Sequence, residues 1–286
     1  MTVLEAIQRS AEFLARKGVD SPRLQAELLL AHLLKLPRMR LYLNFERALE
    51  SGEMDAFREF IRRRGRREPL QYIVGATSFC GLELAVNPHV LIPRPETELL
   101  AERGWQFLDE LPGLNSAAAL DVGTGSGCLA IALAVKCPRA RVQAVERSAE
   151  ALAVARQNAK RHAVAERIQL LQGDGFDSLP AGSGFELIIS NPPYIATAEL
   201  ETLQPEVGGH EPRLALDGGA DGLDFFRRMA AEAGPFLKSG GRLMLEFGDG
   251  QAEAIHEMFE REKWIVEAFH EDYTRRPRIA VVKREP

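Results

Sequence analysis

A short segment in the second half of the chain carries the residues best suited to chemistry. An apolar run over residues 185–190 ends at Asn191-Pro192-Pro193-Tyr194. The run has the composition of a buried strand, and two consecutive prolines can neither continue a sheet ladder nor begin an ordinary helical turn. The chain is therefore expected to leave the sheet abruptly, at the strand end where open α/β sheets bind ligands.

These four residues suit the binding of a planar amino group. The side-chain oxygen of Asn191 and the carbonyl of Pro192 can each accept one N–H, and the Tyr194 ring can lie against the planar face. Pro193 completes the turn that presents them. A proline-rich turn around a buried tyrosine is the structural alternative, and the segment alone does not decide between the two.

A glycine-rich turn upstream provides a second candidate site. A predicted strand at 117–122 runs into Gly123-Thr124-Gly125-Ser126-Gly127, and a helical pattern follows. Glycines at alternate positions let the backbone turn tightly and let a ligand approach without Cβ clashes. The next predicted strand, at 141–146, ends at Glu146, whose carboxylate can accept both hydroxyls of a ribose.

Two kinds of adenosine-containing ligand fit this turn. A strand, a glycine turn, a helix and an acidic residue about 20 positions later also describe a dinucleotide site. Asp121 and the opening glycine, Gly123, favour S-adenosylmethionine (SAM) instead. SAM has no pyrophosphate for a helix N-terminus to hold, and its cationic methionine end favours a nearby carboxylate. Together with residues 191–194, the turn predicts a methyltransferase that acts on an amide or amino nitrogen.

The chain resembles the bacterial peptide chain release factor glutamine methyltransferases along nearly its whole length. The matching stretches are residues 92–98, 121–127, 191–195, 211–223 and 240–248. The resemblance implies transfer of the SAM methyl group to the side-chain amide nitrogen (N5) of the glutamine in the Gly-Gly-Gln loop of release factors, which tunes translation termination. It implies class 1 release factors as partners. The three cysteines are odd in number and lack paired spacing, which suggests reduced thiols in the cytoplasm.

The resemblance also implies roles for individual residues. Residues 123–127 are expected to hold the methionine moiety beside Asp121, and Glu146 to bind the ribose, although many relatives have Asp there. The adenine is expected at Asp174-Gly175-Phe176, where some relatives carry an aromatic residue in place of the glycine. Catalysis is expected from Asn191, Pro192 and Tyr194, the substrate is expected to contact residues 191–194, and Asn191 is also expected to border the methyl donor.

The order of predicted elements describes two domains joined by a hairpin. Residues 1–70 carry helical apolar stripes and are expected to form a small substrate-docking bundle, and residues 71–93 alternate as a β-hairpin linker does. Residues 94–286 alternate strands with helices, which predicts a mostly parallel, doubly wound α/β sheet. The predicted strands are 117–122, 141–146, 168–172, 185–190, 242–247, 264–271 and 278–284. No helix fits between the last two, so they should pair antiparallel, the pattern of class I SAM-dependent methyltransferases.

Composition narrows the class of function. A net charge of −5 with 45% hydrophobic residues is typical of a globular protein and argues against stable binding of nucleic acid over the whole surface. No stretch of about 18 apolar residues is present, so no membrane span is expected. The three cysteines and six histidines lack the spacing of metal ligands, so no metal is expected.

Other interpretations stay open at this level. Transfer to the N6 amine of adenine in DNA or RNA would present the same geometry in a flipped base, although no basic, aromatic-laced recognition domain is evident. A SAM-binding scaffold would not need the intact Asn191 segment, and a dehydrogenase would need a nicotinamide site after Glu146. Six arginines between residues 58 and 67 form either a solvated helix face or a docking patch.

Overall fold

The protein, a computed structural model of which describes residues 1–113 and 115–284, divides into two compact units. Unit 1 comprises Met1–Ala76 and Gln204–His210, and unit 2 comprises the remainder of the described chain. Residues 114, 285 and 286, which fall in the domain expected at 94–286, lie outside the described residues. The division expected at 1–70, 71–93 and 94–286 stays a prediction.

Unit 1 is helical because its apolar side chains recur at the helical period and meet in one core. Its helices are α1 (Val3–Arg16), α2 (Pro22–Leu33), α3 (Arg38–Tyr42), α4 (Ser51–Gly65), α5 (Leu70–Val74) and α9 (Pro205–Gly208). Thr2 caps α1 in a capping box with Glu5, which satisfies backbone N–H groups of the first turn. Leu14, Leu30 and Phe57 are among the side chains buried in the core.

The arginine run pairs largely within unit 1. Arg64, which is buried, donates from Nη2 to Oε1 of Glu206 at 2.8 Å, and Arg67 Nε donates to the same oxygen at 2.8 Å. Other arginines of the run form ion pairs with acidic neighbours, namely Arg58 with Asp55, Arg62 with Glu59 and Arg63 with Glu68. The contacts to Glu206 hold the segment 204–210 in unit 1, so much of this positive charge is structural.

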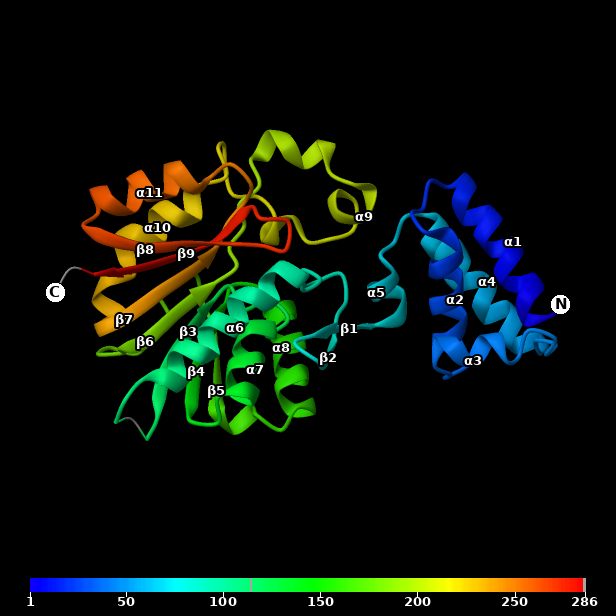
Figure 1. The fold of residues 1–286 in the computed structure, drawn as a ribbon, viewed down its shortest axis with the longest axis horizontal. Coiled ribbons are helices and arrows are strands. Elements are labelled where there is room, and N and C mark those ends of the chain that lie inside the picture. The colour runs from blue at the N-terminus through cyan, green and yellow to red at the C-terminus, as the bar shows by residue number, and fades with distance from the viewer. Residues whose placement is uncertain (114, 285–286) are drawn as a thin grey trace. The chain divides into compact units, whose positions relative to one another are not determined.

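Unit 2 contains a seven-stranded sheet with the order β5-β4-β3-β6-β7-β9-β8 (Figure 1). The strands are β3 (Ala117–Val122), β4 (Ala140–Glu146), β5 (Ile168–Gln172), β6 (Phe185–Ser190), β7 (Leu237–Glu246), β8 (Trp264–Glu271) and β9 (Pro277–Arg284). Neighbouring strands from β5 to β7 are parallel, whereas β9 runs antiparallel to both β7 and β8. The predicted fold class is confirmed, including the antiparallel hairpin at the end.

Helices cover both faces of this sheet (Figure 1). They are α6 (Pro95–Glu110), α7 (Cys128–Lys136), α8 (Ala149–Arg161), α10 (Asp224–Glu232) and α11 (Ala252–Arg261). Leu187 and Ile189 of β6 share a core cluster with residues of α6, α7 and α8, whereas Ile188 belongs to the cluster that includes residues of α10 and α11. Successive strand residues point to opposite faces, so both faces must be apolar.

A short hairpin precedes α6, as expected, but it is shorter than the sequence suggested. Its strands are β1 (Ala76–Phe79) and β2 (Leu82–Ala85), because residues near 74 belong to helix α5. Asn158 of α8 binds both the N–H and the carbonyl of Ala85 and also donates to the Ser126 carbonyl at 2.9 Å. This one carboxamide ties the hairpin to the glycine turn.

Strand β3 lies between β4 and β6. The chain connects β3 to β4 and β5 on one side of it, and then continues to β6 and β7 on its other side. The carboxyl ends of these strands therefore meet where consecutive connections diverge, which is the usual ligand-binding edge of a doubly wound sheet. The two candidate segments, residues 123–127 after β3 and residues 191–194 after β6, both start at this edge.

Candidate active site

A cavity of about 930 Å³ opens at this edge of the sheet. It is within the range of roughly 300–1,000 Å³ that small-molecule sites occupy. The predicted site residues that line it are Gly123, Thr124, Gly125, Ser126, Glu146, Asp174, Gly175, Asn191, Pro192 and Pro193. Residues far apart in the sequence thus share one cavity.

The glycine turn is open toward the cavity. Gly123 and Gly125 have φ of 74° and 55°, and a Cβ at either position would meet no heavy atom within 4 Å. Glu146 braces the turn, since its Oε2 accepts from the Gly125 N–H at 2.9 Å and its Oε1 from the Ser148 N–H at 2.8 Å. Each carboxylate oxygen keeps a further lone pair, so Glu146 can also accept from ligand hydroxyls.

Four of the expected site residues do not line the cavity, namely Asp121, Gly127, Phe176 and Tyr194. Tyr194 is half-buried, and Gly127 caps α7 with φ of 83°, where a Cβ would press on Ala155. Phe176 is buried and stacks on Phe236 with ring centroids 5.0 Å apart. Phe176 therefore does not provide the adenine wall left open by Gly175.

Asp121 is fully buried beneath the glycine turn. Its Oδ2 accepts from Thr124 Oγ1 at 2.6 Å and from the Ala130 N–H at 3.1 Å, while Oδ1 has no hydrogen-bond partner among the described residues. Burial raises the pKa of Asp121 to about 7, against the opposing effect of these two donors. An unpaired buried carboxylate oxygen beside an open glycine turn fits a ligand that carries positive charge, such as the methionine end of SAM.

The raised pKa of Asp121 predicts a trade-off between stability and ligand binding. The folded state keeps a proton that the unfolded chain loses near pH 4, so this stabilisation is full below that pH and is lost as pH rises through about 7. Asp121→Asn keeps an acceptor without the charge. We expect its free energy of unfolding to exceed that of the wild type at pH 8, by an amount on the order of a few kcal/mol, and to match it far more closely near pH 4. We also expect it to bind SAM more weakly at pH 8.

Urea unfolding followed by tryptophan fluorescence at the two pH values measures this difference, because Trp105 and Trp264 both belong to unit 2. Asp249→Asn, which changes an exposed aspartate of the same unit, is the control. Equal stability differences at both pH values would contradict the assignment of the pH dependence to Asp121.

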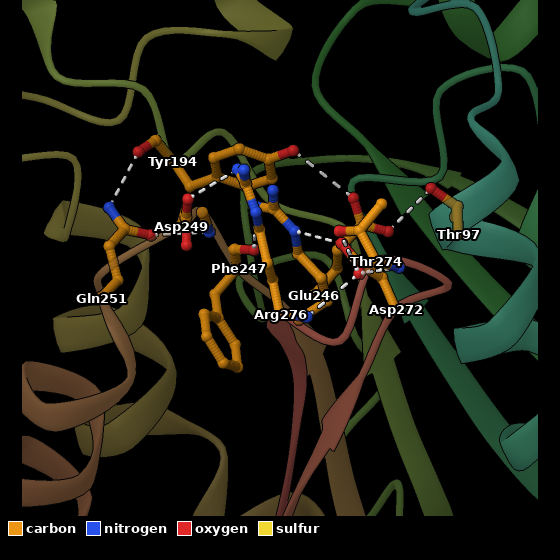
Figure 2. Close-up of polar contacts among 11 residues, drawn as sticks. Thr97, Tyr194, Glu246, Phe247, Asp249, Gln251, Asp272, Thr274 and Arg276 are labelled. Carbon is orange, nitrogen blue, oxygen red and sulfur yellow. Dashed lines mark hydrogen bonds and ion pairs between the residues drawn. The ribbon is translucent and has the colours of Figure 1, made fainter.

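A buried hydrogen-bond relay lies behind Asn191. Asn191 Nδ2 donates to Thr97 Oγ1 at 2.9 Å, and Thr97 Oγ1 donates to Glu246 Oε2 at 2.7 Å. Figure 2 shows Tyr194 reaching the same carboxylate, with its hydroxyl 3.5 Å from Glu246 Oε1. Gln251 donates to the Tyr194 carbonyl at 2.9 Å and so fixes the backbone of this residue. The sequence did not assign Thr97 or Glu246 a role, although both lie in stretches that carried the resemblance.

Arg228 of α10 occupies the space beside Gly175. Its Nη1 donates to Asp174 Oδ1 at 2.6 Å and its Nη2 to the Asp174 carbonyl at 2.9 Å. A Cβ at Gly175 would lie 2.6 Å from the Arg228 Cζ, so the guanidinium stands where a side chain at position 175 would begin. Arg228 also lines the cavity. Sequence reasoning missed it because the helix that carries it comes 53 positions later.

An ion pair between the partly exposed Arg94 and the buried Glu211 fixes the loop that closes one side of the cavity. Glu211 accepts from Arg94 Nη2 at 2.6 Å and from the Ile92 N–H at 3.3 Å. Burial raises the pKa of Glu211, and the Arg94 guanidinium opposes that effect. The residues that follow, including Pro212, Leu214 and Asp217, line the cavity. The loop is thus held beside the start of α6, which explains why residues 92–98 and 211–223 belong to one site.

Among the described residues, no group of three or more His, Cys, Asp or Glu side chains is placed to hold a metal ion. No helix in the described ranges is long and apolar enough to cross a membrane.

Comparisons with known proteins relate the chain to methyltransferases. Residues 5–75 match the model of the PrmC N-terminal domain, and residues 103–205 match that of the methyltransferase small domain. The chain is 48% identical over 260 residues to the release factor glutamine methyltransferase of Geobacter sulfurreducens, covering 91% of this chain and 89% of that one. It is 46% identical over 258 residues to the same-named protein of Chlorobaculum tepidum, covering 88% and 87%. A solved methyltransferase from Pyrococcus furiosus shares the fold, with a TM-score of 0.52 at 22% identity, and the match covers 78% of this chain and 99% of that one.

Proposed function

The chain belongs to the release factor glutamine methyltransferase family, a SAM-dependent protein methyltransferase family, and from this membership we propose how its cavity performs the transfer. One observation carries the proposal. The Asn191 segment and the glycine turn line the same cavity, so an amide bound at one can meet a methyl donor bound at the other.

Residues of this chain fit SAM along the cavity. The open turn at residues 123–126 receives the methionine moiety above Asp121, and Glu146 receives the ribose hydroxyls through lone pairs that its backbone contacts leave free. Asp174 and Gly175 border the adenine. SAM supplies a methyl group that is activated by its sulfonium.

The glutamine amide requires orientation and charge stabilisation. A carboxamide nitrogen is a poor nucleophile, because its lone pair is delocalised into the carbonyl. The Asn191 side-chain oxygen and the Pro192 carbonyl each accept one N–H, which turns the nitrogen toward the methyl donor. These hydrogen bonds strengthen as positive charge grows on nitrogen, so they stabilise the transition state more than the bound substrate. Tyr194 lies behind the segment and holds its backbone in place, since the Tyr194 carbonyl accepts from Gln251 Nε2 at 2.9 Å.

Arg228 takes the place of the aromatic adenine wall. Its guanidinium covers Gly175, and planar guanidinium groups stack well on aromatic rings. We expect Arg228→Ala to weaken SAM binding by about fivefold, in line with roughly 1 kcal/mol for an exposed stacking contact. Isothermal titration calorimetry with SAM measures the effect.

Arg227→Ala is the matched control. Arg227 lies on the same helix, pairs with Asp221 and Asp224, and is half-exposed. Equal SAM affinities for the two variants would contradict the role given to Arg228.

The substrate is assigned to class 1 release factors, with unit 1 as their docking domain. Unit 1 exposes large apolar side chains at Met39 in α3 and at Leu43, which follows that helix directly, and this supports a role in protein contact. The net charge of −5 supports a protein partner over stable nucleic-acid binding. The three cysteines are unpaired, which is consistent with the reducing cytoplasm.

Transfer of labelled methyl from SAM to a purified class 1 release factor tests the function. A release factor whose Gly-Gly-Gln glutamine is replaced serves as the control substrate. We expect label in the first substrate and none in the second. Label in DNA or RNA instead would favour the adenine alternative, and SAM binding without any transfer would favour a scaffold.

A further inference from the structure

The Asn191 carboxamide must face its substrate with the correct atom. Its oxygen accepts an N–H, whereas its nitrogen would present a donor to another donor. The two ends of a carboxamide have nearly the same size, so cavity shape alone does not select the orientation. Hydrogen-bond partners behind the side chain must decide it.

The partner behind Asn191 is Thr97, which has a defined hydrogen-bond direction. Thr97 is 1% exposed and sits in the first turn of α6, and Glu246 is 2% exposed at the end of β7. Burial raises the pKa of Glu246 to about 7, against the opposing effect of the Thr97 hydrogen bond. The ionised carboxylate that prevails above that pH can only accept, so Thr97 donates its single hydroxyl proton to Glu246, at 2.7 Å. The remaining lone pairs of Thr97 Oγ1 can be satisfied only by a donor.

We propose that Thr97 and Glu246 are positioning residues that fix the direction of the Asn191 carboxamide. Because Thr97 Oγ1 offers only lone pairs, Asn191 turns Nδ2 toward it, at 2.9 Å. The Asn191 Oδ1 then faces away from Thr97 and serves as acceptor for the substrate amide. This inference rests on the proposed function of Asn191 and extends it to Thr97, which lines the same cavity, and to Glu246, which does not.

Glu246 holds the other end of the segment as well. The Tyr194 hydroxyl lies 3.5 Å from Glu246 Oε1 (Figure 2). Thr97 links the same buried carboxylate to Asn191, so Glu246 is the common anchor of the two side chains that flank the prolines. Three elements meet here, because Thr97 comes from α6, Asn191 follows β6 and Glu246 ends β7. A relay of this kind acts on orientation and leaves the SAM contacts of the glycine turn unchanged.

Thr97→Ala and Thr97→Ser form a matched pair that tests the relay. Both variants lose the methyl group of Thr97, and they differ only in the hydroxyl. We expect Thr97→Ala to lower kcat by about 10- to 100-fold, the scale of a misaligned reacting group. We expect Thr97→Ser to stay within about threefold of the wild type. SAM affinity and the KM for the release factor should be nearly unchanged in both.

A double variant separates orientation from packing. If Thr97 acts through Asn191, Thr97→Ala should reduce kcat in the wild-type background but have little further effect once Asn191→Ala is present. Glu246→Leu, which removes the acceptor of Thr97, should reduce kcat at least as far as Thr97→Ala.

The outcomes are distinct. Failure of the wild type to methylate the release factor would reject the proposed function itself. An active wild type with equal kcat in Thr97→Ala and Thr97→Ser would overturn the relay. A loss confined to SAM affinity would also overturn it. The same holds for a fall in melting temperature that the two variants share and that accounts for the lost activity. Full additivity of Thr97→Ala with Asn191→Ala would overturn it as well.

Discussion

Asn191→Ala is expected to lower the turnover of release factor methylation by roughly 100- to 1,000-fold, the scale measured when one preorganised polar group is removed from an active site. The variant removes the acceptor that orients the glutamine nitrogen and stabilises its growing charge. SAM binding should be retained, because the contacts proposed for the glycine turn and Glu146 do not involve residue 191. Single-turnover transfer of labelled methyl, alongside calorimetric titration with SAM, measures both quantities.

Asn191→Asp is expected to lose most turnover as well. It retains acceptor oxygens but places a carboxylate beside Thr97, whose proton is already donated to Glu246. Asn115→Ala is the matched control, since Asn115 is exposed and precedes β3 at the opposite end of the strand from the cavity. Near-normal methylation by Asn191→Ala would remove the segment from the mechanism.

Glu146→Ala is expected to weaken SAM binding by about 100-fold. A hydrogen bond to a charged group contributes roughly 1.5–3 kcal/mol, and tenfold in affinity corresponds to about 1.4 kcal/mol. The variant loses the ribose contact and also the brace to the Gly125 N–H. Turnover at saturating SAM should be affected much less than affinity, because Glu146 does not contact the substrate amide.

Glu146→Asp distinguishes the effect of the carboxylate from the effect of side-chain length. It keeps both acceptor oxygens on a side chain one methylene shorter, so we expect its loss of SAM affinity to be clearly smaller than that of the alanine variant. Glu166→Ala, at an exposed position next to the start of β5, should bind SAM as the wild type does. If Glu146→Ala binds SAM with unchanged affinity, the ribose lies elsewhere in the cavity.

The agreement between predicted and observed elements has a local cause. Buried parallel strands are short apolar runs bounded by breakers, and each of the seven predicted strands lies on an observed one. The main difference is β7, which begins at Leu237 and not at 242, because its first residues pair with β6 across an irregularity of register.

Candidate residues outside the cavity wall show where local reasoning ends. Asp121 and Phe176 lie next to lining residues in the sequence, but strand alternation and loop geometry turn their side chains into the protein. Asp121 supports the glycine turn from beneath, and Phe176 packs on Phe236. Adjacency to a motif therefore did not decide which side chains face the ligand.

The sequence by itself determined the class of fold, the glycine turn, the carboxylate after the second strand of the sheet and the Asn191 segment. Each of these depends on the order of residues within one strand and the turn that follows. Only the tertiary structure decided that Thr97 links Asn191 to Glu246, that Arg228 covers Gly175, and that residues 204–210 belong to unit 1. Thr97 is 94 positions from Asn191 and 149 positions from Glu246 in the sequence. Folding of the chain, and not a local sequence pattern, therefore brings these side chains together.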